Sequence, residues 1–184
     1  MKTNAIILLL IAGLALLLVG CGPTGQPDAS PQQQPVEADG DPLDITALSF
    51  SHSASYTEGC YLIEIKGTDS GTHIRAEELF GLQRVAEAVT EEDVLAQLGE
   101  LTGKYHVERW DGFNESDSMV QDGSSFSLDI TLADGSTITA RGSNSFPKHY
   151  SKIEDVLWAL YDDWMERYAM SEEEWAAQEG ADEG

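Results

Sequence analysis

The chain has 184 residues and a large excess of acidic side chains, with 33 Asp and Glu against 10 Lys and Arg and a formal net charge of −23. A chain this acidic repels phosphate backbones, so we exclude nucleic acid as a partner and expect any charged partner to be basic. The length behind the apolar N-terminus is enough for one modest hydrophobic core without disulfide bonds.

The first residues have the layout of a bacterial secretion signal. Lys2 precedes an apolar run over 6–18, near the lower limit for spanning a bilayer, and Leu18-Val19-Gly20-Cys21 ends that run. This layout resembles the lipobox of bacterial lipoproteins, in which the Cys is diacylated on sulfur and the peptide before it is removed. The resemblance implies that 1–20 is a lipoprotein signal peptide and that Cys21 anchors the mature chain in the bilayer, at the extracytoplasmic face of the cell membrane. The alternative is an ordinary signal anchor in which Cys21 occurs by chance.

Processing there changes the charge of the chain. Removal of 1–20 takes away one positive charge, Lys2, so that −23 becomes −24. Acylation of Cys21 leaves Cys60 without a partner, so no intramolecular disulfide is expected. Cys60 begins an apolar stretch and is expected to be a small buried side chain.

Composition divides the mature chain into three parts. The segment 21–43 is rich in Pro and Gln and poor in bulky apolar residues, which predicts a disordered, extended tether after the lipidated Cys. The segment 44–170 is expected to form one domain. The segment 171–184 is an acidic tail.

The first half of the domain favours strands. Alternating apolar and polar residues predict strands over 48–51 and 61–66, with a turn over 67–71 and a partner strand over 73–79. The segment 83–89 is ambiguous between strand and helix.

A helix is expected next. Thr90 is a good N-cap, the three acidic residues after it suit the positive end of a helix dipole, and Gly103 is a typical stop signal. The alternation over 105–110 predicts a strand after this helix.

The clearest β-hairpin signal lies over 126–142. Apolar residues alternate with polar ones over 126–132, and Asp134-Gly135 predicts a type I′ turn before the return strand over 137–142. A last helix begins at Ser151, which forms a capping box with Glu154, and its apolar face is expected to pack on the hairpin 126–141. This order predicts an α+β fold: a single domain with an antiparallel sheet and two main helices packed on one face.

No catalytic motif is present. The chain lacks serine-hydrolase and zinc-protease signatures, and its four histidines show no metal-ligand spacing. The loop 111–117 is rich in oxygen ligands but departs from the calcium-binding EF-hand pattern at Phe113. We therefore predict no catalytic residue, metal or cofactor. Two alternatives stay open, a cell-envelope enzyme that uses His106 or His149 beside a carboxylate, and a calcium-dependent adhesion element.

Three short motifs frame the hairpin: Trp110-Asp111-Gly112-Phe113, then Asp122 to Phe126, then Gly142 to Pro147. Together they resemble an uncharacterised lipoprotein family of Gram-positive bacteria, over about 105–160. The resemblance carries no activity. Asn144 and Phe146 are explained as structural residues in a turn before a proline.

One polar surface is a candidate for recognition. If Leu128 and Ile130 face the helix, then Asp129 and Arg141 share the exposed face of the sheet, where they are expected to form a cross-strand ion pair. The leading hypothesis is a membrane-tethered, non-catalytic binding or accessory module with an envelope protein or a small ligand as partner. Recognition would use this face or the loops 111–125 and 142–150, with Arg141, Asp129, Trp110 and Asn144 as possible binding residues.

Overall fold

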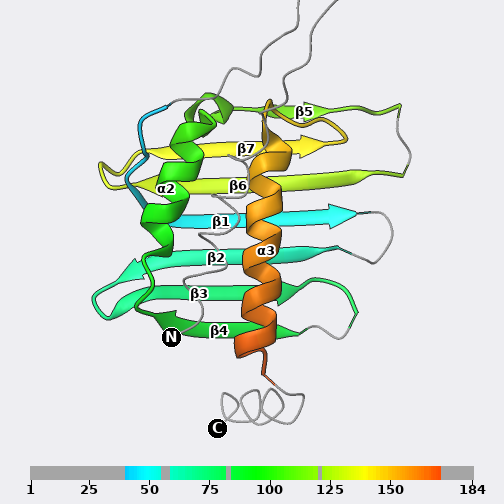
Figure 1. Cartoon of the computed structure of the whole chain (residues 1–184). Coiled ribbons are helices and arrows are strands. Elements are labelled where there is room, and N and C mark those ends of the chain that lie inside the picture. Colours follow the sequence, from blue (N-terminus) through cyan, green and yellow to red (C-terminus); the bar gives the residue numbers. More distant parts are fainter. Residues whose placement is uncertain (1–39, 55–58, 82–83, 120–121, 171–184) are drawn as a thin grey trace, which may run out of the picture. The chain divides into compact units, whose positions relative to one another are not determined.

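The computed structural model describes residues 40–54, 59–81, 84–119 and 122–170 (Figure 1). The predicted signal peptide, the predicted lipidation site Cys21 and the acidic tail 171–184 therefore lie outside the described residues. In chain order the elements are β1 (Ile45–Ala54), β2 (Tyr61–Thr68), β3 (Gly71–Glu78), β4 (Val85–Thr90), α2 (Val94–Lys104), the 3-10 helix η1 (Val107–Trp110), β5 (Asn114–Ser116), β6 (Ser124–Leu132), β7 (Thr137–Ser143) and α3 (Tyr150–Tyr168).

The strands form one seven-stranded sheet in the order β4-β3-β2-β1-β6-β7-β5. Every neighbouring pair is antiparallel except β5 and β7, which are parallel. The described domain is therefore an α+β fold with a mostly antiparallel sheet. The strand β5 was not expected from sequence, because its three residues lie in the loop considered as a calcium site.

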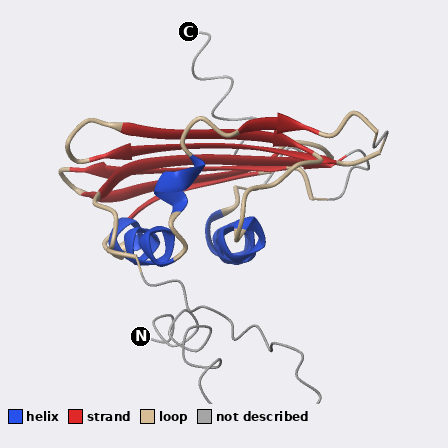
Figure 2. Ribbon diagram, turned by 90° about the horizontal axis from the view of Figure 1, so that it is seen from above, coloured by secondary structure: helices blue, strands red, loops and turns tan. Residues whose placement is uncertain are grey.

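The core lies on one face of the sheet. Burial alternates along the strands, so that Tyr61, Ile63 and Ile65 of β2 are buried while the residues between them are not. The register places Leu48 beside Ile130 on the same face. Figure 2 shows α2 and α3 on the same side of the sheet, and in Figure 1 both helices cross the strands, α3 from the β7 side towards β4. The other face of the sheet carries mostly polar side chains, although Leu62 and the exposed Val89 also lie on it.

The segment 40–43 runs alongside α2, from Gly103 towards Gly99. The amide of Leu43 donates to the carbonyl of Gly99 at 3.0 Å. A Cβ atom on Gly99 would lie 2.2 Å from the Leu43 carbonyl oxygen, and one on Gly103 would lie 2.1 Å from that of Asp41. The two glycines let the backbone of 40–43 lie directly on the helix. The residues assigned to the end of the tether from sequence therefore pack against the domain.

The predicted helix starts were wrong at both helices. Thr90 ends β4, and the N-cap of α2 is Asp93, whose side chain accepts from the amide of Ala96 at 3.2 Å. No acidic residue lies in the first turn of α2. At α3 the N-cap is His149, with a left-handed φ of 67° and no side-chain cap, so Ser151 and Glu154 form no capping box.

Three further expectations need correction. The segment 105–110 contains η1 and no strand, because His106 takes a left-handed φ of 56° that breaks an extended run. The hairpin turn is not type I′, since Gly135 has a positive φ and Asp134 does not. The helix α3 meets the 126–141 hairpin at its start, where the Tyr150 and Phe126 ring centroids are 4.6 Å apart, and the strands it packs on most closely are β2, β3 and β4.

Candidate ligand-binding pocket

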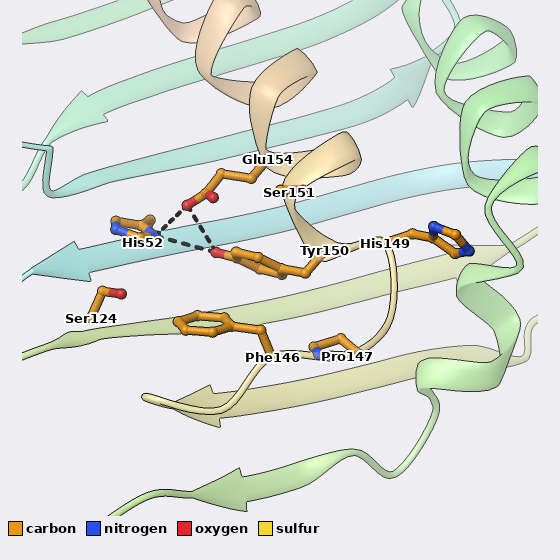
Figure 3. A pocket seen from close by; sticks show the side chains of 8 residues that line it. All are labelled: His52, Ser124, Phe146, Pro147, His149, Tyr150, Ser151 and Glu154. Atoms are coloured by element: carbon orange, nitrogen blue, oxygen red, sulfur yellow. Dashed lines mark hydrogen bonds and ion pairs between the residues drawn. The ribbon is translucent and has the colours of Figure 1, made fainter. Parts of the chain in front are cut away.

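A pocket of about 410 Å³ opens where the end of β1, the start of β6 and the first turn of α3 meet (Figure 3). Its volume falls in the range of small-molecule sites, roughly 300–1,000 Å³. It is lined by His52, Ser124, Phe146, Pro147, His149, Tyr150, Ser151 and Glu154. These residues combine hydroxyl groups, two aromatic rings, imidazole and one carboxylate.

The connection between β7 and α3 builds one wall of this pocket. Asn144 and His149 both have positive φ values, 53° and 67°, and Pro147 lies between them. The amide of Tyr150 donates to the carbonyl of Pro147 at 3.1 Å, which begins the helix. These bends place Phe146 and Tyr150 next to each other, with ring centroids 4.7 Å apart. Part of the predicted recognition loop 142–150 is thus a wall of the pocket.

Three polar side chains meet at the inner end of the pocket. Nδ1 of His52 lies 2.8 Å from Oε1 of Glu154 and 3.2 Å from the hydroxyl of Tyr150. That hydroxyl donates to Oε1 of Glu154 at 3.1 Å. Figure 3 shows the three side chains converging while the His149 ring points away from them.

This geometry assigns roles to the hydrogens. Burial, followed by the nearby charge of Glu154, raises the pKa of Tyr150, so its phenol stays protonated and remains a donor. The imidazole of His52 satisfies the carboxylate best with its proton on Nδ1. Its Nε2 then has a free lone pair, and no hydrogen bond within the described residues engages that atom.

A buried tyrosine supports His52 from the core side. The rings of Tyr61 and His52 stack with centroids 5.9 Å apart. Tyr61 is 1% exposed, and within the described part of the chain its hydroxyl has no hydrogen-bond partner. An unsatisfied buried hydroxyl costs roughly 1–3 kcal/mol. The core face of the sheet, which is otherwise apolar, therefore carries two polar groups beside the pocket, the His52 imidazole and the Tyr61 hydroxyl.

The candidate residues from sequence lie elsewhere. Nη2 of Arg141 lies 2.7 Å from Oδ2 of Asp129, which confirms the expected cross-strand pair on the open face. Trp110 is 3% exposed and donates from Nε1 to the carbonyl of Lys148 at 3.2 Å, so it belongs to the core. Asn144 packs closely against Gly123, since a Cβ atom on Gly123 would lie 1.5 Å from Oδ1 of Asn144. This contact holds two loops together and is structural.

Sequence reasoning missed both His52 and Glu154. His52 lies two residues after Phe50 in β1, so its imidazole is on the apolar face of the strand. A polar side chain at such a position is the sequence signal that could have identified it. Glu154 was assigned to a capping box that does not form. Two histidines were considered for catalysis from the sequence. His149 lines the pocket. His106 is not among the lining residues, and its Nδ1 lies 3.0 Å from Oε1 of Glu108.

Two other kinds of feature, metal clusters and membrane-spanning helices, are absent from the described residues. Among the described residues, no three His, Cys, Asp or Glu side chains are placed to hold a metal ion. None of the helices described here is both long enough and apolar enough to cross a membrane. No protein-family model matches the chain, and no curated protein matches its sequence.

Proposed function

We propose that this chain is a lipid-anchored extracytoplasmic protein whose domain binds a small polar ligand in the pocket at the start of α3. The anchor is argued from Leu18-Val19-Gly20-Cys21. Binding is argued from one observation, the convergence of His52, Tyr150 and Glu154 at the inner end of a concave site of suitable size.

The pocket chemistry fits a ligand with hydroxyl groups and one apolar face, such as a sugar ring. Phe146 is 39% exposed at the edge of the pocket and offers an aromatic surface for stacking. Glu154 accepts hydrogen bonds, and Nε2 of His52 and the Ser124 hydroxyl are further partners. An anionic ligand is disfavoured by the Glu154 carboxylate and by the net charge of −23.

A second candidate function is catalysis at the same place. A carboxylate that holds Nδ1 of a histidine leaves Nε2 able to take a proton, which is the arrangement of a general base. The Ser124 hydroxyl lines the same pocket. The sequence left open a cell-envelope enzyme that uses His106 or His149 beside a carboxylate. In this second candidate function the histidine is His52 instead.

Calorimetric titration of the chain from Cys21 onward with N-acetylglucosamine oligomers tests the binding proposal. We expect saturable binding that weakens at least tenfold in His52→Gln and in Glu154→Gln. His106→Gln is the matched control, because it removes an imidazole paired with a carboxylate outside the pocket. Equal affinity in all variants would place the ligand elsewhere. Chromatography of the sugar after incubation distinguishes binding from hydrolysis.

A further inference from the structure

A second exposed aromatic side chain lies one helical turn beyond the pocket. Trp158 follows Glu154 by four positions in α3, and residues so spaced are neighbours on a helix surface, with about 5–6 Å between their Cβ atoms. Trp158 is 38% exposed, whereas Trp110 and Trp164 are 3% and 2% exposed. Among the described residues it is thus the one tryptophan with a large part of its ring in solvent. The surface next to the pocket carboxylate therefore carries an aromatic ring that the core does not enclose.

Tyr61 joins this tryptophan to the pocket. The ring of Trp158 meets the Tyr61 ring edge-on, with centroids 4.7 Å apart, and the other contact of Tyr61 is the stacked His52 imidazole at 5.9 Å. Tyr161 stacks on Trp158 with centroids 5.3 Å apart. Both tyrosines are buried, so they hold the indole in one orientation. An aromatic surface that is fixed in this way before a ligand arrives loses little entropy on binding.

Aromatic and polar groups alternate along this flank of α3. The exposed ring of Phe146, which lies against Tyr150, is at one end. The polar atoms of His52 and Glu154 come next, and Trp158 is at the other end. Because α3 continues from the pocket towards β2 and β4 (Figure 1), a ligand that leaves the pocket along this flank reaches Trp158. A sugar ring has an apolar face of C–H groups and an edge of hydroxyl groups, so a chain of such rings matches the alternation.

The charges around Trp158 disfavour an anionic chain. Asp155 and Asp162 lie three positions before and four positions after Trp158, so both are its neighbours on the helix surface. Both are exposed, and neither takes part in an ion pair within the part of the chain that the structure describes. Together with Glu154 they place carboxylates on both sides of the indole, which repel carboxylate, sulfate and phosphate groups.

Resting on the sugar-binding pocket of the proposed function, we propose that the site takes a chain of neutral sugars, with Trp158 as a second stacking surface outside the pocket. One ring of the chain occupies the pocket against Phe146, and a later ring stacks on Trp158. Two contacts with one ligand add affinity only when the ligand is long enough to span both. Chain length, as well as the identity of one sugar, therefore determines binding.

A chain-length series tests this proposal. The chain from Cys21 onward is titrated calorimetrically with N-acetylglucosamine, its disaccharide and its trisaccharide. We expect the trisaccharide to bind at least tenfold more tightly than the monosaccharide. Trp158→Leu should weaken the trisaccharide by about fivefold, as for the loss of one stacking contact, and leave the monosaccharide affinity unchanged. Trp158→Phe keeps an aromatic ring and should restore most of the trisaccharide affinity.

Tyr168→Leu is the matched control. Tyr168 is a half-buried aromatic side chain of the same helix, and it lies roughly 20 Å along α3 from Glu154, beyond the reach of a trisaccharide in the pocket. This variant should keep all three affinities. Retained monosaccharide binding in Trp158→Leu serves as a second control, because it shows that the pocket survives the substitution.

The possible failures are distinguishable. Equal affinities for the monosaccharide and the trisaccharide would overturn the second stacking surface and leave the pocket as a site for one ring. Equal weakening of both sugars in Trp158→Leu would overturn it as well, since Trp158 would then only support the pocket. Tighter binding of a galacturonic acid trisaccharide would contradict the choice of a neutral chain. Absence of binding by every sugar would contradict the proposed function and this inference together.

Discussion

Glu154 joins α3, near the start of this helix, to the end of β1 through His52, with Oε1 of Glu154 2.8 Å from Nδ1 of His52. The side chains are 14% and 28% exposed for His52 and Glu154, so solvent screens the pair only in part. The hydroxyl of Tyr150 contacts both groups. This contact fixes one wall of the pocket against the sheet.

A double-mutant cycle should detect this contact. We expect His52→Gln and Glu154→Gln to show a coupling of about 1 kcal/mol in the free energy of unfolding at pH 7, measured in urea. The pair His106 and Glu108, 29% and 42% exposed, is the control and should give less than about 0.5 kcal/mol. Equal coupling in the two cycles would mean that the pocket pair contributes no more than a surface contact.

Gly103→Ala should reverse the usual effect of alanine in a helix. Alanine normally stabilises a helix by about 1 kcal/mol over glycine. Here its Cβ would meet the Asp41 carbonyl oxygen at 2.1 Å, so we expect a loss of about 1–3 kcal/mol. In a chain that begins at Asp44 the same change should become stabilising. Urea unfolding of the four proteins measures this, and a loss in both backgrounds would contradict the packing of 40–43 on α2.

Stability should fall at alkaline pH because of buried tyrosines. Burial, then the charge of Glu78, raises the pKa of Tyr161 to about 12, and burial raises the pKa of Tyr61 as well. Unfolded tyrosine ionises near pH 10, at about its reference value. The stabilisation is therefore complete below pH 10 and is lost as pH rises through about 12.

Tyr61→Phe provides the measurement. Because the Tyr61 hydroxyl has no partner among the described residues, we expect the variant to match or exceed the wild type by up to about 1 kcal/mol at pH 8. Between pH 8 and pH 11 it should lose less stability than the wild type in urea unfolding. An equal loss would show that Tyr61 does not contribute to the pH dependence.

The variant Arg141→Ala distinguishes ligand binding at the open face of the sheet from ligand binding in the pocket. Arg141 donates to the carbonyls of Leu128 and Ala140 and pairs with Asp129, but its side chain is 41% exposed. We expect a loss of about 0.5–1 kcal/mol in unfolding free energy and no change in calorimetric binding of the sugar oligomer. A loss of binding with the fold intact would move recognition to the open face of the sheet.

The long periodic elements of the fold were predictable from sequence. Strict alternation from Phe126 to Leu132 identified β6, and the 3.6-residue period from Ile153 to Trp164 identified α3. Such patterns indicate which side of an element is buried, and in the structure the apolar sides of β6 and α3 are the buried ones. The pairing of Arg141 with Asp129 followed from the same alternation.

Local signals failed where tertiary contacts override them. Thr90 is a good N-cap in isolation, but it pairs with Thr72 in the sheet, and Asp93 caps α2 instead. Tyr105 and Val107 alternate as in a strand, yet the left-handed backbone of His106 breaks the run. His52 and Glu154 are 102 positions apart in the sequence, and no local pattern relates them, so their pairing needed the fold.

The most direct test of the central claim is a residue-resolved nuclear magnetic resonance titration of the chain from Cys21 onward with an N-acetylglucosamine oligomer. The pocket proposal predicts saturable shift changes at His52, Phe146 and Tyr150, with Asp129 and Thr139 on the open face unchanged. Shift changes that cluster on the open face, or no shift changes at all, would contradict it.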